Sequence, residues 1–223
     1  YAALYGFFPC LTQNAGAYME FPEDLRITKG DMSFNVNSAY TVARDAVGNK
    51  TPEDRLRQRC SIAVGDWAMA DLLRFQNGPV EAGLKALECG APIFTDIRMV
   101  STGIQKKGHC CSVECALDYG ADIAKREGIT RSSAGFTALK DRLSGSIVVI
   151  GNAPSALFAV CSFIDEGIVP ALIIGTPVGV VNAAESKEYL RTKPVSAVSN
   201  VGTRGGTPVA VASLNEIITM YAE

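Results

Sequence analysis

Short apolar runs alternate with longer helical patterns over the second half of the chain. The apolar runs lack a regular alternation with polar residues, which is typical of strands buried on both faces of a parallel sheet. They lie at 92–95, 110–113, 147–150, 171–174 and 196–199. Apolar positions with helical spacing occur between or after these runs, at 132–143, 154–166, 183–190 and 207–221.

This alternation predicts right-handed strand–helix–strand crossovers and therefore a parallel sheet. We expect an α/β fold: a flavodoxin-like, doubly wound sheet of about five parallel strands with helices on both faces. Ligands of such sheets bind outside the carboxyl ends of the strands. The turns that follow the strands are therefore the places to look for chemistry.

The start of the chain has a different pattern. Gly and Pro interrupt every periodic run in residues 1–33. Such interruptions are typical of irregular structure. We therefore expect an irregular N-terminal arm at 1–33 and a single domain at 34–223.

Three helical patterns precede the first apolar run, at 37–47, 52–60 and 80–88. Thr51 and Pro52 are typical of a helix N-cap and first helical position, and Gly90 is typical of a helix end. The segment 65–75 fits a helix, or a helix followed by a strand.

Composition and charge narrow the class of protein. The chain has 223 residues, of which 48% are hydrophobic and 20% are charged, as expected for a globular domain and not for a disordered one. The net charge is −2, which gives weak support for binding nucleic acid or an anionic membrane. No apolar stretch reaches the roughly 20 residues of a spanning helix. We therefore expect neither nucleic acid nor a membrane as a partner.

The cysteines and the first residues bear on location. Seven cysteines are an odd number in a chain too large to need disulfides, which favours reduced thiols. The apolar first residues lack the basic segment of a signal peptide. Both features favour a cytoplasmic location.

Three turns after predicted strands are rich in glycine. After 147–150, Gly151 allows a close turn, Asn152 can cap, and the helix from Pro154 offers free N–H groups to an anion. The turn 175–182 contains Thr176 and Gly179, and Asn182 with Glu185 forms a partial capping box. The turn 199–208 surrounds Arg204 with Gly202, Gly205 and Gly206.

Each turn alone is also typical of an ordinary strand–helix connection. Three such turns along one edge of a sheet predict a shared anion-binding rim. None has the GxGxxG or P-loop pattern, so a dinucleotide or nucleoside triphosphate site is not indicated.

A fourth segment, Thr130-Arg131-Ser132, precedes the helical pattern at 132–143. Thr130 or Ser132 can cap that helix, and Arg131 is well placed to bind a carboxylate. The alternative is a surface arginine beside a plain N-cap.

The segment His109–Cys115 contains three cysteines and the only histidine. Its spacing is poor for a metal, because adjacent residues of a strand point to opposite faces and no Cys-x-x-Cys pair occurs elsewhere. We expect no metal site and interpret these cysteines as buried strand thiols. A hydrolase is disfavoured because the chain lacks a GxSxG elbow.

Several of these segments closely resemble the precorrin-8X methylmutase family. The similar strings are Cys89-Gly-Ala-Pro-Ile-Phe-Thr-Asp-Ile-Arg-Met-Val100, Thr130-Arg-Ser132, Gly151-Asn-Ala-Pro-Ser-Ala-Leu-Phe158, Gly175-Thr-Pro-Val-Gly-Val-Val-Asn-Ala-Ala-Glu-Ser-Lys187 and Gly202-Thr-Arg-Gly-Gly-Thr207. The resemblance extends from about Ser38 to the C-terminus, and its longest string is specific.

The resemblance implies a flavodoxin-like fold and a homodimer with its site near the subunit interface. It implies an isomerase of cobalamin biosynthesis that moves a methyl group between neighbouring carbons of ring C of precorrin-8X or cobalt-precorrin-8. The product would be hydrogenobyrinic acid in the aerobic route or cobyrinic acid in the cobalt-first route. Neither a methyl donor nor a redox cofactor is needed, so no cofactor is expected.

This macrocycle has apolar faces and carboxylates at its edge. Helix N-termini and backbone N–H groups suit those carboxylates, and cationic side chains add charge-assisted contacts. We expect the substrate-binding residues to be Thr130, Arg131, Ser132, Asn152, Thr176, Gly179, Lys187, Arg204 and Gly205.

The chain departs from the family at the catalytic position. The family's catalytic histidine falls on Ile62, and isoleucine cannot donate or accept a proton. Asp66, Cys60 and Ser61 are the candidate replacements, whereas His109 lies on a different segment.

Three hypotheses follow from this departure. The chain is an active isomerase that uses another acid, which we rank first. The alternatives are a catalytically silent homologue that binds corrinoids or other tetrapyrroles, and a different small-molecule reaction on the same scaffold.

Overall fold

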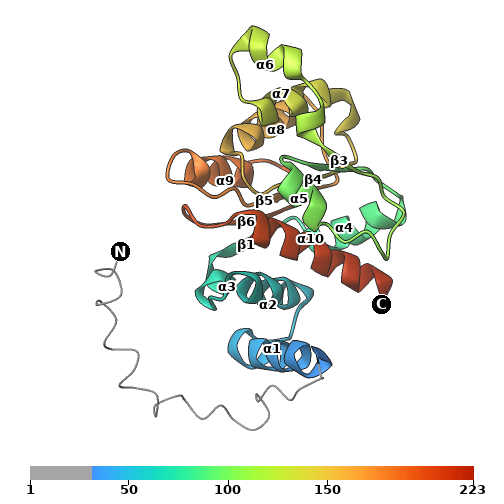
Figure 1. The fold of residues 1–223 in the computed structure, drawn as a ribbon, viewed down its shortest axis with the longest axis vertical. Helices are drawn as coiled ribbons and strands as arrows, with labels where there is room; N and C mark the ends of the chain where they lie inside the picture. The colour runs from blue at the N-terminus through green and yellow to red at the C-terminus, as the bar shows by residue number, and fades with distance from the viewer. Residues whose placement is uncertain (1–31) are drawn as a thin grey trace, which may run out of the picture. The chain divides into compact units, whose positions relative to one another are not determined.

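The computed structural model describes residues 32–223, and the fold of residues 43–223 is built around one six-stranded sheet (Figure 1). The strands are β1 (Leu73–Gln76), β2 (Ile93–Thr95), β3 (Val113–Cys115), β4 (Ile147–Ile150), β5 (Leu172–Gly175) and β6 (Ala197–Asn200). Their order across the sheet is β1-β6-β5-β4-β2-β3.

Five of these strands are parallel, and β1 pairs with β6 in the antiparallel direction. Numbered among themselves, the parallel strands β2 to β6 lie in the order 2-1-3-4-5, which is the flavodoxin-like order. The predicted doubly wound sheet of about five parallel strands is therefore confirmed. The sixth strand, β1, lies within the segment 65–75 that the sequence left open between helix and strand.

One predicted strand is displaced. The third strand of the chain is Val113–Cys115, not 110–113 as predicted. Cys110 and Cys111 thus precede the strand, and Cys110 is exposed. The interpretation of all these cysteines as buried strand thiols is wrong for Cys110, because the strand begins where Val113 pairs with Ile93 of β2.

The helices of the first half are α1 (Met32–Val47), α2 (Pro52–Val64), α3 (Ala68–Leu72), α4 (Pro79–Glu88) and α5 (Arg98–Gly103). The second half has α6 (Ala121–Glu127), α7 (Arg131–Ala138), α8 (Pro154–Asp165), α9 (Ala183–Arg191) and α10 (Thr207–Ala222). Short 3-10 turns lie at η2 (Ala116–Asp118) and η3 (Lys140–Arg142). The sequence pattern did not predict α5 or α6, which are only six and seven residues long.

Residues 1–31 lie outside the described residues, and so does nearly all of the predicted arm. Helix α1 begins at Met32, within the last residues of that arm, and the compact unit described here begins at Ala43. The domain boundary at 34 stays a prediction.

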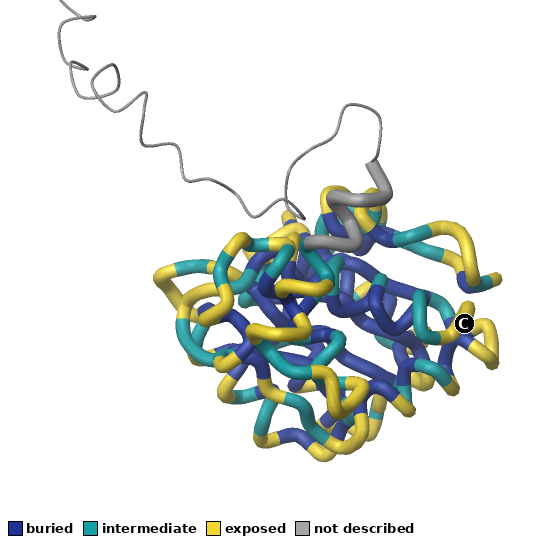
Figure 2. Tube along the Cα trace, turned by 90° about the horizontal axis from the view of Figure 1, so that it is seen from below, coloured by how far each residue is buried: buried dark blue, intermediate teal, exposed yellow. Residues whose placement is uncertain are grey.

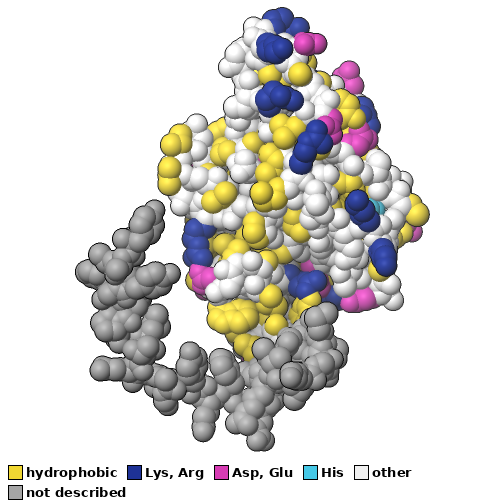
Figure 3. Space-filling model, in the orientation of Figure 1, with side chains coloured by type: hydrophobic (Ala, Val, Ile, Leu, Met, Phe, Trp, Pro, Cys, Tyr) yellow, Lys and Arg dark blue, Asp and Glu magenta, His cyan; other side chains and the backbone are white. Residues whose placement is uncertain are grey.

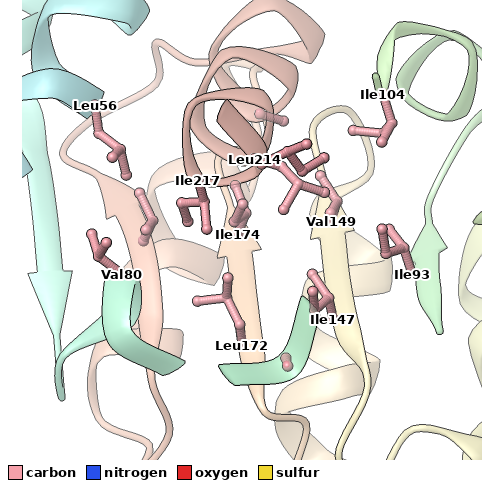
Figure 4. Close-up of a cluster of buried hydrophobic side chains, with 14 of the residues drawn as sticks. Leu56, Val80, Ile93, Ile104, Ile147, Val149, Leu172, Ile174, Leu214 and Ile217 are labelled. Carbon is pink, nitrogen blue, oxygen red and sulfur yellow. The ribbon is translucent and has the colours of Figure 1, made fainter. Parts of the chain in front are cut away.

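Figure 2 shows the buried backbone gathered in the interior of the molecule, with exposed segments around it. Alternate side chains of the strands lie in two separate hydrophobic cores, one of which is drawn in Figure 4. Val149 of β4 and Ile174 of β5 face α10 in one core, with Leu214 and Ile217 of that helix. The intervening residues, such as Val148 and Ile173, face α7, α8 and α9 in the other core. These strands are fully buried, which is why their sequences are apolar without alternation.

Two local signals in the first half act as the sequence predicts. The Thr51 hydroxyl accepts from the Asp54 N–H, and the Asp54 carboxylate accepts from the Thr51 N–H, which forms a complete capping box for α2. Gly90 adopts the left-handed conformation just after α4 ends. No helix within the described part is long and apolar enough to cross a membrane.

Candidate active site

The carboxyl ends of the five parallel strands bring four loops to one edge of the sheet. The loops follow β2, β4, β5 and β6, as the flavodoxin-like order requires. The junction between α2 and α3 joins them, because antiparallel β1 starts at this edge, where Leu73 pairs with Asn200 at the end of β6. We call this side of the molecule the carboxyl edge.

The turn after β4 is filled by a side chain of the protein itself. Asp96, directly after β2, accepts hydrogen bonds from the N–H groups of Gly151 (3.2 Å), Asn152 (2.7 Å) and Ala153 (2.8 Å). The Asp96 side chain is fully buried. Burial raises the pKa of its carboxyl, and the three N–H donors act in the opposite direction.

This contact corrects one expectation. The N–H groups of the turn before α8 are not free for an external anion, because the carboxylate of Asp96 already accepts from them. Asn152 remains exposed through its side chain. The prediction missed Asp96, although its position directly after a buried strand is a signal that could have found it.

The segment 130–132 lies beside this turn. The Thr130 hydroxyl accepts from the Ser133 N–H, so Thr130 is the N-cap of α7, and it also contacts the Ser155 hydroxyl of α8 at 2.8 Å. Ser132 is buried and donates to the backbone oxygen of Asp96. Arg131 is exposed, and its guanidinium donates to the backbone oxygen of Leu117.

The turns after β5 and β6 are held together by backbone contacts. The Gly179 N–H donates to the Thr203 oxygen (3.0 Å), and the Gly206 N–H donates to the Thr176 oxygen (2.8 Å). Gly205 has φ +145°, and a Cβ atom there would lie 2.3 Å from the Thr176 oxygen. Glycine is therefore required at 205 by both its backbone conformation and its close neighbour.

A buried lysine supports these two turns from below. Lys187 of α9 is fully buried, and its ammonium group donates to the Arg204 oxygen (2.6 Å) and to Asn200 Oδ1 (3.2 Å). Both acceptors are neutral. Burial lowers the pKa of Lys187 to about 8, and the charge of Arg191 lowers it further, while Glu188 acts in the opposite direction.

The predicted capping box before α9 is wrong. Asn182 has φ +62° and makes no side-chain hydrogen bond to the helix, so it ends the loop in a left-handed conformation instead of capping. This conformation is tolerated by asparagine better than by most residues.

Arg204 is exposed at the carboxyl edge and forms an ion pair with Asp66 from the junction of α2 and α3. Asp66 also accepts from the Ala68 N–H at 2.9 Å. The Arg204 guanidinium holds the pKa of the Asp66 carboxyl below its usual value. The pair joins residues 138 positions apart in the sequence.

Ile62 lies one turn before this ion pair. It is half-buried near the end of α2, and Gly65 donates to its backbone oxygen in the left-handed turn that leads to Asp66. Of its neighbours, Cys60 is fully buried against Val209 and Ser213, and burial raises the pKa of its thiol to about 12. Ser61 is also fully buried, and its hydroxyl has no hydrogen-bond partner. Asp66 is the one of the three candidate proton donors that is not buried, and its side chain is 38% exposed.

His109 lies far from this edge in the fold, in the loop that leads into the amino end of β3. Its Nδ1 accepts from the Cys111 N–H at 3.1 Å, so its Nε2 carries the proton donated to the Gln105 oxygen at 2.6 Å. Both ring nitrogens thus hold the loop together. In the part of the chain that the structure describes, no group of three or more His, Cys, Asp or Glu residues is placed to hold a metal ion.

Comparisons with known proteins agree on one family. The sequence profile of the precorrin-8X methylmutase family matches residues 35–220. The cobalt-precorrin-8 methylmutase of Methanocaldococcus jannaschii is 42% identical over 195 residues, which cover 81% of this chain and 91% of that protein. The precorrin-8X methylmutase of Pseudomonas aeruginosa is 41% identical over 174 residues, which cover 74% of this chain and 83% of that protein.

A solved structure has the same fold. The precorrin-8x methyl mutase from Thermus thermophilus matches with a TM-score of 0.77 at 33% sequence identity. The match covers 84% of this chain and 95% of that chain.

Proposed function

This chain belongs to the precorrin-8X methylmutase family and is an isomerase of cobalamin biosynthesis, and we propose that it binds its corrinoid substrate at the carboxyl edge of the sheet. The reaction is the migration of a methyl group on ring C of precorrin-8X or cobalt-precorrin-8. The alternative of a silent corrinoid-binding homologue rests on Ile62 alone, and the names of the related proteins favour the isomerase.

The exposed Arg204 is the main support for placing the substrate at the carboxyl edge. It lies in the turn after β6, next to Thr203, whose oxygen accepts from Gly179 of the turn after β5, and its side chain is exposed. A carboxylate at the rim of the macrocycle can replace Asp66 as its partner, because both anions accept from the same guanidinium. The backbone N–H groups of the turn after β4 have a structural role instead, since the Asp96 carboxylate already accepts from them.

We assign two roles to the predicted substrate-binding residues. The exposed or half-exposed ones contact the substrate directly: Thr130, Arg131, Asn152, Gly179, Arg204 and Gly205. The buried ones hold the loops that carry these contacts: Ser132, Thr176 and Lys187.

Asp66 is our candidate for the proton transfer that Ile62 cannot perform. Substrate and product are isomers, so a proton delivered to the corrinoid must return to the protein before release. When a substrate carboxylate takes Arg204, Asp66 loses the cation that lowers its pKa. The apolar macrocycle then covers the carboxyl and raises its pKa further, which favours the protonated form.

The decisive experiment is a turnover assay with precorrin-8X and with cobalt-precorrin-8. We expect the parent chain to convert one of them and Asp66→Asn to lose kcat by about 10²-fold or more, without loss of corrinoid binding. Ile62→His, run beside them, should raise kcat by restoring a second proton donor. Full activity of Asp66→Asn would remove Asp66 from the mechanism. Binding without turnover by the parent, together with turnover by Ile62→His, would establish the silent homologue.

Arg204 has a separate test in corrinoid binding. Arg204→Met should weaken the binding of cobyrinic acid at least about tenfold, because a charge-assisted hydrogen bond is lost. Arg126→Met is the matched control: Arg126 is an exposed arginine of α6 that pairs with its neighbour Glu127. Equal affinities of the two variants would place the carboxylate elsewhere.

We further propose that the chain works as a homodimer in the cytoplasm. The family resemblance supports the dimer, and sedimentation equilibrium at micromolar concentration tests it, a monomer being the contrary result. The six cysteines of the described residues are all free, which supports a reducing compartment.

A further inference from the structure

Large apolar side chains are exposed mainly at the carboxyl edge. Of the nine exposed in the described part of the chain, six lie in or beside loops of this edge: Trp67, Met99, Ile129, Val178, Val180 and Val181. Val180 is 91% exposed and Val181 is 70% exposed. Exposed apolar side chains that gather in one place are typical of binding sites, whereas scattered ones are common on any surface. Figure 3 shows hydrophobic side chains at the left border of the molecule, over the loop that precedes α9 in Figure 1.

Four of these side chains belong to two segments that adjoin the Arg204–Asp66 ion pair. Trp67 directly follows Asp66 in the chain. Gly179, in the middle of the loop with the three valines, donates to the oxygen of Thr203, which precedes Arg204. Val178 also packs against the Gly206 backbone region. We call Trp67, Val178, Val180 and Val181 the apolar rim.

We propose that the apolar rim contacts one flat face of the corrinoid macrocycle while Arg204 binds a carboxylate at its edge, so that Val180 and Trp67 determine affinity for macrocyclic polycarboxylates. This inference rests on the proposed function and adds to it which part of the ligand these side chains contact, namely the flat apolar face. It assigns a binding role to two side chains that carry no charge and take no part in proton transfer.

The charge around the rim fits this occupant. Arg204 lies within it, Lys187 lies buried behind it, and Asp66 is the one anion paired there. A ligand with an apolar face and peripheral carboxylates matches both features at once.

A second copy of the chain fits this rim less well. Stable protein interfaces use about 20–30 residues a side, and the rim offers four side chains on two loops.

The test is the affinity of cobyrinic acid, followed through the absorption spectrum of the corrinoid. Val180→Asn should weaken binding about tenfold, because the apolar contact of one valine is lost. Val180→Phe should bind at least as tightly as the parent. Val169→Asn is the control, since Val169 is also an exposed valine but precedes the amino end of β5; its affinity should be unchanged.

The location of the bound corrinoid is tested by hydroxyl-radical footprinting with and without cobyrinic acid. Trp67 is the only tryptophan of the chain, so its oxidation is identified without ambiguity. Bound corrinoid should protect Trp67 and leave Tyr221, which is 38% exposed near the end of α10, unprotected.

The outcomes separate this inference from the proposed function. If the parent converts substrate but Val180→Asn binds like Val169→Asn, the rim proposal is wrong and the isomerase stands. If Val180→Asn instead changes the sedimentation of the free protein, the rim is an interface between copies. If the parent neither binds nor converts a corrinoid, both proposals fail.

Discussion

The turn after β4 and the paired turns after β5 and β6 lie at the same carboxyl edge, but only one of them is already filled. The turn after β4 contains one glycine, Gly151, whereas the paired turns contain Gly179, Gly202, Gly205 and Gly206. In the first, the buried Asp96 carboxylate accepts from three backbone N–H groups, so the turn is complete without a ligand. In the second, Arg204 is exposed, its support Lys187 has only neutral partners, and the neighbouring valines face solvent.

The difference is one of compensation. A buried anion with three donors contributes to folding, because each donor would otherwise be left without a partner. A buried cation without an anion opposes folding and persists only if it serves another purpose. The turn after β4 therefore stabilises the fold where the neighbouring strands β2 and β4 end. The paired turns after β5 and β6 are available for a ligand.

The largest expected effect comes from removing the carboxylate that fills the turn after β4. Asp96→Ala leaves three N–H groups without an acceptor and should lower the free energy of unfolding by about 3 kcal/mol. Asp96→Asn keeps one acceptor oxygen and should cost roughly half as much. Urea denaturation measures both. A loss for Asp96→Ala no larger than that of a surface substitution would mean that water satisfies this turn.

The second prediction compares two glycines of the open turn. Gly205→Ala brings a Cβ atom against the Thr176 oxygen and should destabilise the protein by about 2 kcal/mol. Gly202→Ala meets no atom within 4 Å and should cost only the left-handed conformation, about 1 kcal/mol. Thermal and urea unfolding of the two variants give the ratio of the two losses in the free energy of unfolding. Equal losses would show that the loop at 205 shifts freely away from Thr176.

The third prediction separates stability from binding at Lys187. Since its pKa is lowered from 10.5 in the unfolded chain to about 8, the unfolded state binds a proton between these pH values that the folded state does not. The stability of the parent should therefore rise with pH from about 8 toward 10, relative to Lys187→Met.

At pH 7, the free energy of unfolding of Lys187→Met should lie within about 1 kcal/mol of that of the parent. The substitution removes two hydrogen bonds, but it also removes a poorly compensated buried charge. Its corrinoid affinity should fall, since the backbone of Arg204 loses its support. Urea unfolding at pH 7.5 and 9.5 with a cobyrinic acid titration tests both parts. A variant that binds normally would limit Lys187 to a structural role.

The smallest expected effect concerns two buried hydroxyls. Thr176 and Ser61 are fully buried and have no hydrogen-bond partner for their hydroxyl oxygens. Thr176→Val and Ser61→Ala should therefore leave the free energy of unfolding unchanged or raise it by up to about 1 kcal/mol. If Thr176→Val alone also weakens corrinoid binding, the loop opens to expose this hydroxyl to the ligand.

Much of the scaffold could be predicted from local patterns. The buried strands β4 and β5 are predicted as 147–150 and 171–174 from their apolar residues, and Thr51 caps α2, because these signals act within a few residues of the chain. For 65–75 the sequence left a helix, or a helix followed by a strand, and the second alternative holds because β6 offers β1 an edge. Helices α5 and α6 could not be predicted, because they are too short to show a period.

The candidate site divides in the same way. The sequence alone determined the family resemblance, the glycine-rich turns and the edge of the sheet on which they lie, since turn geometry and strand direction are local or follow from the crossover rule. It also identified Ile62 as the departure from the family. Only the tertiary structure decided which turn is already filled, which cation is exposed and which candidate acid reaches the surface. Those outcomes depend on Asp96 meeting Ala153 and on Arg204 meeting Asp66, contacts between residues 57 and 138 positions apart that no local pattern specifies.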